Sequence, residues 1–194
     1  AGQMTLVLAS GSPYRRELLA RLRLQFEVVA PDVDETAAAG ERPAALAARL
    51  ARAKAQAVAS SRPRAIVIGS DQVASLDGRT PIGKPGTLAR AREQLRAASG
   101  RAMQFHTAYA VVAPGRPLVE AIVPVTVRFR ELDAAEIDRY LELEQPLDCA
   151  GAARCEGLGI SLLEAIHTED PTALVGLPLI QLAGTLRGLG LSVP

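Results

Sequence analysis

The sequence predicts an α/β fold: a long, twisted, mixed β-sheet flanked by helices, arranged in two lobes with a substrate cleft between them. Residues 65–73 form a short apolar run that stops at a glycine, a serine and an acid, which is typical of a strand buried on both faces. Residues 5–24 follow the order strand, small-residue turn, helix. Residues 103–131 contain two long segments around the turn Pro114-Gly115-Arg116-Pro117, which indicates antiparallel strands.

Composition places the chain among globular proteins. It has 194 residues, 48% of them hydrophobic, and a mean hydropathy of +0.14, so we expect a single domain over residues 1–194. Residues 1–3 are expected to precede a native start at Met4. With a net charge of +1, nothing in the overall charge balance argues for a nucleic-acid partner, and none is predicted.

Membrane and disulfide classes are also excluded. Every apolar stretch is broken by Arg or Pro well before the roughly 20 residues that span a bilayer, and no signal peptide is recognisable at the start of the chain. Cys149 and Cys155 have neither zinc nor redox spacing, so we interpret them as two unpaired thiols in a reducing cytoplasm. His106 and His167 each lack a second histidine at ligand spacing and are interpreted as structural.

The elements of the first half follow from local signals. Residues 5–9 form an apolar strand, and the turn Ser10-Gly11-Ser12-Pro13 caps a helix over residues 13–24 with proline at its first position. A second strand is predicted over residues 26–30. The Ala-rich residues 43–61 predict a long helix before the central strand.

The second half alternates turns with the remaining elements. Asp77-Gly78 is a hairpin signal, and residues 133–136 form a capping box that opens a helix reaching Leu141. Alternation of Val123, Val125 and Val127 points one face of a strand to the core. The other predicted elements are a helix over residues 87–98, strands over 103–113, 118–131 and 160–166, and a last helix over 178–189.

Several segments carry groups suited to phosphate chemistry. Asp71 ends the central strand, at the carboxyl end where open α/β folds bind ligands. Ser10, Ser12, Arg15 and Arg16 surround a helix start that favours an anion, although an ordinary capped helix with solvated arginines explains the pattern equally well. From the residues alone, the acidic loop of residues 32–35 is a solvated loop more readily than a metal-ligand cluster.

Lysine usage adds a further indication. Lys54 and Lys84 are the only lysines in a chain with 22 lysine and arginine residues, which marks both as positions where a compact ammonium is needed. Lys54 lies among alanines of the predicted long helix, where a solvated lysine is the default interpretation. Lys84 lies on a stiff loop between Gly83 and Pro85.

An ordered set of motifs resembles the Maf family of nucleoside triphosphate pyrophosphatases, whose fold is similar to that of inosine triphosphatase. The resemblance covers nearly the whole chain, and the ordered set is specific where each piece alone is weak. The matching segments are Leu8-Ala9-Ser10-Gly11-Ser12-Pro13-Tyr14-Arg15-Arg16-Glu17-Leu18-Leu19, Asp32-Val33-Asp34-Glu35, Arg49-Leu50-Ala51-x-x-Lys54-Ala55, Ile68-Gly69-Ser70-Asp71, Gly83-Lys84-Pro85 and Val175-Gly176-Leu177-Pro178.

Three segments divide this family further: Gly69-Ser70-Asp71-Gln72-Val73, Cys149-Ala150-Gly151 and Cys155-Glu156-Gly157-x-Gly159-Ile160. In these segments the chain resembles the branch that acts on 7-methyl-GTP. The resemblance implies that Tyr14, Gln72 and Glu156 set base specificity, with Tyr14 at a position commonly held by Trp. N7-methylated guanine is cationic, so an aromatic face gains a cation–π contribution of roughly 0.5 to 2 kcal/mol. The Glu156 carboxylate can accept hydrogen bonds from the base and balance its charge, and the Gln72 amide can donate or accept.

The resemblance also implies a reaction and its ligands. It implies hydrolysis of the α–β phosphoanhydride, with Mg²⁺ or Mn²⁺ held by Glu35 and Asp71, Asp71 also serving as general base, in a house-cleaning role against modified nucleotides. The residues expected to cradle the triphosphate are Ser10, Ser12, Arg15, Lys54 and Lys84, with Arg16 less firmly placed. Family members are often homodimers, so a homodimer is possible here. Where the family often has Thr-Gly, this chain has Thr107-Ala108.

Other functions remain open at this point. The enzyme could prefer UTP or dTTP, or the chain could be a non-catalytic nucleotide-binding regulator of cell division, since relatives have been linked to septum formation. A haloacid-dehalogenase-type phosphatase is disfavoured because Val73 stands where its second Asp is needed. A Ser-His-Asp hydrolase is disfavoured because no Gly-x-Ser-x-Gly elbow is present.

Overall fold

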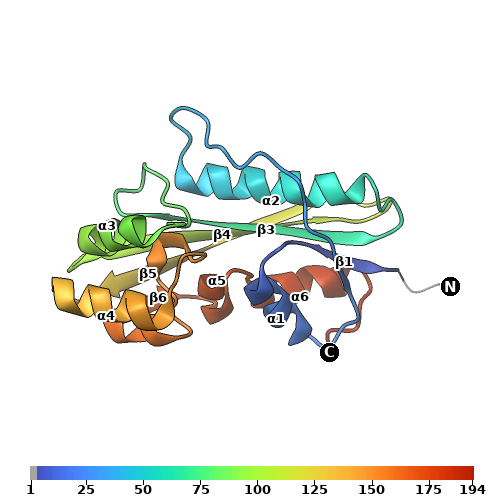
Figure 1. Ribbon diagram of the computed structural model, residues 1–194. Helices are drawn as coiled ribbons and strands as arrows, with labels where there is room; N and C mark the ends of the chain where they lie inside the picture. Colours follow the sequence, from blue (N-terminus) through green and yellow to red (C-terminus); the bar gives the residue numbers. More distant parts are fainter. Residues whose placement is uncertain (1–3) are drawn as a thin grey trace.

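One six-stranded sheet, in the order β2-β1-β3-β4-β5-β6, runs through the computed structural model, which describes residues 4–194 (Figure 1). β1 pairs in parallel with both β2 and β3, whereas β3, β4, β5 and β6 pair antiparallel. The predicted mixed sheet is therefore confirmed. The strands are β1 (Leu6–Ala9), β2 (Glu27–Val28), β3 (Ile66–Ser75), β4 (Ala102–Val112), β5 (Val119–Phe129) and β6 (Leu163–Thr168).

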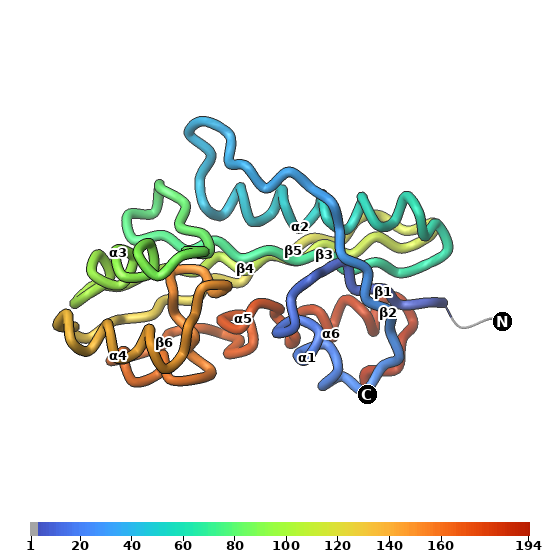
Figure 2. Tube along the Cα trace, in the orientation of Figure 1, coloured from blue at the N-terminus to red at the C-terminus, as the bar shows by residue number. Residues whose placement is uncertain are grey.

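Helices cover both faces of the sheet, as Figures 1 and 2 show. The long helix α2 lies along one face, α1 and α6 lie on the other, and α3 and α4 lie at the end of the sheet far from β1. The helices are α1 (Pro13–Ala20), α2 (Pro43–Ala59), α3 (Leu88–Ala98), α4 (Ala134–Glu144), α5 (Pro171–Val175) and α6 (Leu179–Gly188), with short 3-10 helices η1 (Ala150–Ala152) and η2 (Leu158–Leu162).

The apolar core is divided into parts that match the two expected lobes. Around the parallel strands, one cluster joins α1 and α6 to Ile66 and Ile68 of β3, and another joins α2 to Val67 on the opposite face. A third cluster at the far end packs α3 and α4 against β4 and β5, with Phe105 and Phe129 fully buried. β3 and β4 run through both lobes, so the sheet fixes the lobes relative to one another.

Local signals placed most elements correctly. The capping box at Asp133 is present, with its side chain accepting from the Glu136 N–H, and Val123, Val125 and Val127 are buried as their alternation predicts. Ser12 caps α1 and accepts a hydrogen bond from the Arg15 N–H.

Three boundaries differ from the prediction. The helix expected to reach residue 24 ends at Ala20, because the chain turns back at once, with Arg23 in the left-handed region, towards a β2 of two residues. The strand expected at residue 160 begins at Leu163, because Gly157 and Gly159 donate their N–H groups to the Arg154 carbonyl and wind residues 158–162 into η2. The short helix α5 lies in a region where only turns were expected.

None of the helices between residues 4 and 194 is long and apolar enough to cross a bilayer. Residues 1–3, where an added segment was expected, lie outside the described residues.

Candidate active site

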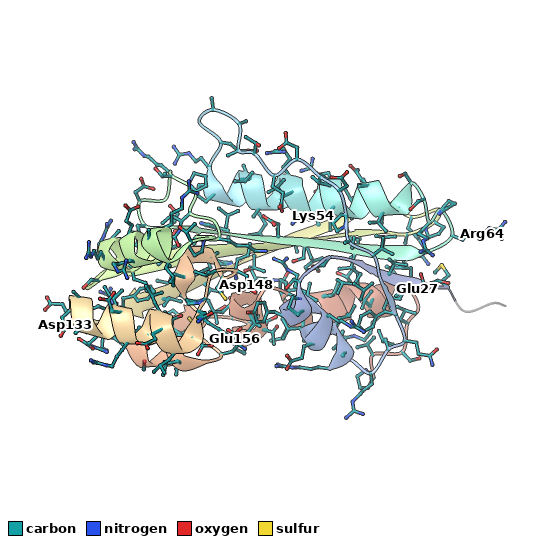
Figure 3. All side chains as sticks on the ribbon, in the orientation of Figure 1. Glu27, Lys54, Arg64, Asp133, Asp148 and Glu156 are labelled. Atoms are coloured by element: carbon teal, nitrogen blue, oxygen red, sulfur yellow. The ribbon has the colours of Figure 1, made fainter. Side chains whose placement is uncertain are left out.

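A cavity of about 380 Å³ lies where the two lobes meet. It is lined from the first lobe by the loop that enters α1 and from the second by the loop over residues 148–156, with β3 between them. Figure 3 shows Lys54 on the α2 side of the sheet and Asp148 and Glu156 on the opposite side. The lining includes nearly all of the sequence-predicted site residues: Ser12, Tyr14, Arg15, Glu35, Asp71, Gln72, Lys84 and Glu156.

The path of β3 explains why the cavity opens at Asp71. Parallel pairing of β1 with β3 ends at the pair Ala9 and Gly69, whereas β3 continues against β4 as far as Ser75. Asp71 was expected at the end of a strand and instead lies inside one. Asp71 still lies just beyond the parallel portion, where β1 has ended and one edge of β3 is open. This is where open α/β sheets bind their ligands, beyond the carboxyl ends of parallel strands.

The alternation of side chains along β3 gives this open edge two different walls. Asp71 points to the face covered by α2, and Ser70 and Gln72 point to the face covered by α5. The cavity reaches both Asp71 and Gln72, so it wraps around the free edge of the strand.

Gly69 lets α2 approach the sheet closely enough to deliver Lys54. A Cβ atom on Gly69 would lie 2.2 Å from the Ala51 carbonyl oxygen and 2.6 Å from the Ala55 nitrogen. Only glycine fits between β3 and the α2 backbone at this point. One helical step before Ala55, Lys54 then meets Asp71.

The Lys54 ammonium bridges two carboxylates. Its Nζ lies 2.6 Å from Glu35 Oε1 and 2.8 Å from Asp71 Oδ1, and the side chains of Lys54 and Asp71 are each only 12% exposed. Burial alone would raise the pKa of Glu35, but the hydrogen bond from Lys54 and the charges of Lys54, Lys84 and Arg15 lower that pKa below its ordinary value. The acidic loop thus contributes Glu35 to the site.

Arg15 is buried beneath the cavity and held by a backbone carbonyl. Its Nε donates to the Gly176 carbonyl oxygen at 2.7 Å. The Ser70 hydroxyl shares its hydrogen between that oxygen, at 3.0 Å, and the Ala108 carbonyl oxygen, at 2.8 Å. Burial lowers the pKa of Arg15, and the nearby charges of Asp71 and Glu35 oppose this shift. A guanidinium with a fixed Nε is well suited to an anion that enters the cavity.

The two serines of the α1 entry loop differ in position. Ser12 lines the cavity, whereas Ser10 is 3% exposed and its Oγ accepts a hydrogen bond from the Ser12 N–H. Ser10 therefore shapes the loop from behind in this structure, and its direct contact with phosphate stays a prediction. Arg16 is exposed and does not line the cavity.

The side-chain amide nitrogen of Gln72 is occupied by hydrogen bonds within the protein. Its Nε2 lies 2.9 Å from the Leu174 carbonyl oxygen, 3.2 Å from that of Ala173 and 3.1 Å from Thr107 Oγ1. Thr107 is fully buried and donates in turn to the Ala173 carbonyl at 2.7 Å. The amide was expected to donate or accept, but with its hydrogens shared among these acceptors it offers the cavity an acceptor, Oε1.

Tyr14 crosses from the first lobe to the second. Its hydroxyl donates to Asp148 Oδ1 at 3.1 Å and accepts a weak hydrogen bond from Cys149 Sγ at 4.0 Å, and the Arg154 guanidinium carbon lies 5.4 Å from its ring centroid. Burial raises the pKa of Tyr14, and the neighbouring Cys149 and Asp148 side chains raise it further, so the phenol stays protonated. The ring is thus fixed at the wall of the cavity.

Glu156 faces the same end of the cavity. Burial raises its pKa above the ordinary value, as do the charges of Glu144 and Asp148, whereas Arg154 lowers it. Arg154 makes its close ion pair with Glu144, at 2.9 Å, and lies 3.7 Å from Glu156. The Glu156 carboxylate therefore lies beside Arg154 and lines the cavity without being occupied by a hydrogen bond to Arg154.

Sequence reasoning missed the residues that support the site. A threonine at position 107, directly before the mainly apolar run of residues 108–112, was the available signal for a buried polar contact. Asp148 and Arg154 carried no local signal, because their partner Tyr14 lies far away in the sequence.

The donors present fit a hard divalent cation. Between residues 4 and 194, no group of three or more His, Cys, Asp or Glu side chains is placed to hold a metal ion. Glu35 and Asp71 nevertheless converge on one cationic nitrogen, and Mg²⁺ in nucleotide sites typically takes one or two carboxylates together with water and substrate phosphates.

Known proteins match almost the whole chain, and the matches agree with the family resemblance of its motifs. The model of the family described as "Maf-like protein" matches residues 5–189. A 7-methyl-GTP pyrophosphatase of Bordetella avium is 58% identical over 186 residues, 96% of this chain and 93% of that protein. Another 7-methyl-GTP pyrophosphatase, from Xanthomonas oryzae pv. oryzae, is 57% identical over 189 residues, 97% of this chain and 98% of that protein.

Among solved structures, the chain aligns with a nucleoside-triphosphatase / dITP/XTP pyrophosphatase from Mycobacterium abscessus at 17% identity and a TM-score of 0.47, over 96% of this chain and 95% of that one. The assignment rests on the family match and the sequence relatives. The chain belongs to the Maf family.

Proposed function

We propose that this protein is a metal-dependent nucleoside triphosphate pyrophosphatase of the cytoplasm that hydrolyses 7-methyl-GTP to 7-methyl-GMP and diphosphate, a house-cleaning reaction. The observation that carries the proposal is one cavity lined by two sets of groups. Cations and carboxylates suited to a metal-bound triphosphate share it with an aromatic ring, an acceptor and a carboxylate suited to a cationic base. The names of the Bordetella and Xanthomonas relatives point the same way.

The phosphate end supplies positive charge on fixed supports. Arg15 is held by Gly176, Lys54 is held by α2, and Lys84 lines the cavity close enough to lower the pKa of Glu35. In phosphoryl transfer most of the catalysis is positioning and charge neutralisation, and these groups provide both to the departing diphosphate. Ser12 adds a hydroxyl and the amino end of α1.

A divalent ion would be held by Glu35 and Asp71, in exchange for the Lys54 ammonium that they now share. Bound there, Mg²⁺ or Mn²⁺ supplies Lewis-acid polarisation of the phosphates. Lys54 released from the carboxylates is then available to the triphosphate.

Asp71 is the group we assign to the attacking water. Its Oδ1 accepts from Lys54, and among residues 4–194 no side chain donates to its Oδ2. Asp71 takes a proton from water as the water oxygen bonds to the α-phosphorus, and the α–β bridging bond breaks with its electrons leaving on diphosphate.

The base end favours methylated guanine. The Tyr14 ring offers a face to the cationic purine, and the Glu156 carboxylate accepts from its N–H groups while balancing its charge. Gln72 adds an acceptor. A neutral pyrimidine such as UTP gains none of the charge contributions.

Diphosphate release from 7-methyl-GTP, GTP, UTP and dTTP, each with Mg²⁺, with Mn²⁺ and with chelator, tests the proposal. We expect 7-methyl-GTP to have the highest kcat/KM and chelator to stop turnover. Preference for UTP or dTTP would contradict the substrate assignment, and binding without turnover would favour a regulatory nucleotide-binding protein.

A further inference from the structure

Arg154 is built into the second lobe more firmly than an exposed arginine requires. Its backbone N–H donates to the Tyr140 hydroxyl at 2.9 Å, and its carbonyl accepts from the Gly157 and Gly159 N–H groups. A Cβ atom on Gly159 would lie 2.4 Å from that carbonyl oxygen. The loop is therefore wound tightly around this one residue.

The Arg154 side chain contacts two of the three predicted base-recognition residues, Tyr14 and Glu156, without lining the cavity. Its guanidinium lies over the Tyr14 ring, pairs closely with the Glu144 carboxylate, which is 13% exposed, and stays 3.7 Å from Glu156. Tyr14 and Glu156 line the cavity, whereas Arg154 does not. The guanidinium thus supports both groups from outside the binding space.

The arrangement is not the one that stability alone would favour. Arg154 Nε is buried and has no hydrogen-bond partner, although the Glu156 carboxylate lies just beyond hydrogen-bond distance. A buried donor left unpaired costs free energy, and pairing it fully with Glu156 would remove that carboxylate from the cavity.

We propose that Arg154 is a positioning residue for the base subsite: its guanidinium supports the Tyr14 ring and the Glu156 carboxylate from outside the cavity, and so sets the discrimination between cationic and neutral guanine. The inference rests on the proposed function, because it names the residue behind that selectivity.

The charges around Glu156 predict a pH signature. Burial and the charges of Glu144 from α4 and Asp148 from its own loop disfavour its ionisation, whereas a hydrogen bond from its own backbone N–H and the charge of Arg154 favour it. The neighbouring thiols of Cys149 and Cys155, whose pKa is raised to about 12, stay protonated and uncharged in this range. A carboxylate must be ionised to recognise a cationic base, so selectivity is lost as the pH falls through the pKa of Glu156. Without Arg154 that pKa rises further, and selectivity is lost at a higher pH.

The experiment compares kcat/KM for 7-methyl-GTP with that for GTP over a range of pH in wild type, Arg154→Gln and Arg154→Lys. Arg154→Gln should lower this selectivity ratio by roughly fivefold, the combined size of one cation–π contact and one partly exposed charge contact. In the plot of this ratio against pH for Arg154→Gln, the acid limb, where the ratio falls as the pH is lowered, should move to higher pH. Arg154→Lys keeps the charge and should restore the position of the acid limb. Titration of the substrate affects all three proteins equally, so it cancels when their pH profiles are compared with one another.

Arg92→Gln is the matched control, since Arg92 is in the same lobe and forms an exposed pair with Asp138, away from the cavity. Thermal melting verifies that each variant folds, and Arg154→Lys keeps the test valid if Arg154→Gln does not. An unchanged ratio and acid limb in the Arg154 variants, or equal losses with both substrates, would overturn the inference. A wild type without preference for 7-methyl-GTP would instead overturn the proposed function.

Discussion

Lys54 stands between two carboxylates, in the place where a bound cation would be held. Glu35 and Asp71 both direct an oxygen at its Nζ, and the pair with Asp71 is largely shielded from water. The default interpretation of Lys54 from the sequence was a solvated helical lysine. The structure instead shows its side chain buried against Asp71. The same two contacts make Lys54 a direct probe of the proposed metal site.

Lys54→Met should therefore destabilise the free protein and make it responsive to metal. Breaking a buried ion pair leaves Asp71 without its cation, which costs about 3 kcal/mol. Added Mg²⁺ or Mn²⁺ should recover part of this loss by binding the two carboxylates, so Tm should rise more in the variant than in wild type. Differential scanning calorimetry with and without metal measures both effects.

Arg52→Met is the control for that experiment. Arg52 lies on the same helix and forms an exposed pair with Glu120, so its loss should cost less than 1 kcal/mol and create no metal response. Equal behaviour of the two variants would argue against a cation site at Glu35 and Asp71.

Cys149 lines the cavity, but its thiol should react slowly with alkylating reagents. Burial, with the charges of Asp148 and Glu156, raises the pKa of its thiol to about 12. At pH 8 only about one thiol in ten thousand is then ionised, so iodoacetamide should react far more slowly than with a free cysteine and should accelerate as the pH rises.

Intact-mass measurement at pH 8, with a denatured sample as the positive control, follows this alkylation. Cys155 is buried and its pKa is likewise raised to about 12, so neither thiol of the folded protein should be labelled quickly. An adduct within minutes would contradict this account of the cavity wall.

At the scale of elements, the approach of α2 to β3 decides the geometry of the site. Gly69→Ala would drive a methyl group into the α2 backbone, which cannot move aside as a flexible side chain would. We expect a loss of about 3 kcal/mol in the free energy of unfolding and a fall in activity as Lys54 shifts from Asp71.

Urea unfolding, with turnover measured on the same preparations, checks this. Gly188→Ala is the matched substitution: Gly188 lies in α6, and nothing lies within 4 Å of its added Cβ. It should leave stability unchanged or raise it by up to about 1 kcal/mol. A Gly69→Ala protein as stable as Gly188→Ala would show that α2 is not held by this contact.

Most elements could be predicted from the sequence because their signals are local. Residues 43–59 are helical by composition, Asp133 and Glu136 announce α4, and the buried valines of β5 alternate. The continuation of β3 beyond Asp71 could not be predicted, because it depends on pairing with strands that are distant in the sequence. Pairing of β3 with β1 ends at Gly69, whereas its pairing with β4 continues to Ser75.

The same division applies to the site. The motifs predicted that Arg15, Glu35 and Asp71 face one ligand, since each segment carries its own signature, and all three line the cavity. The commitment of the Gln72 donor to carbonyls of α5, and the contact of Arg154 with Tyr14, depend on segments that are distant in the sequence. Only the folded chain reveals such tertiary contacts.

At the scale of the whole molecule, the cavity joins two lobes that share one sheet. The groups proposed to bind phosphate come mainly from the first lobe. Of the groups proposed to recognise the base, Glu156 lies in the loop of the second lobe, Gln72 lies on β3, and Tyr14 reaches across from the first lobe to Asp148. The central claim is that this cavity is where hydrolysis takes place, with Asp71 activating the water.

Turnover of 7-methyl-GTP by Asp71→Asn, with Tm and equilibrium binding of the nucleotide measured on the same protein, tests this claim most directly. The account predicts a fall in kcat of at least about a hundredfold, the contribution of a positioned general base, in a variant that still folds and still binds nucleotide. Turnover close to that of wild type would contradict it and would remove Asp71 from the reaction.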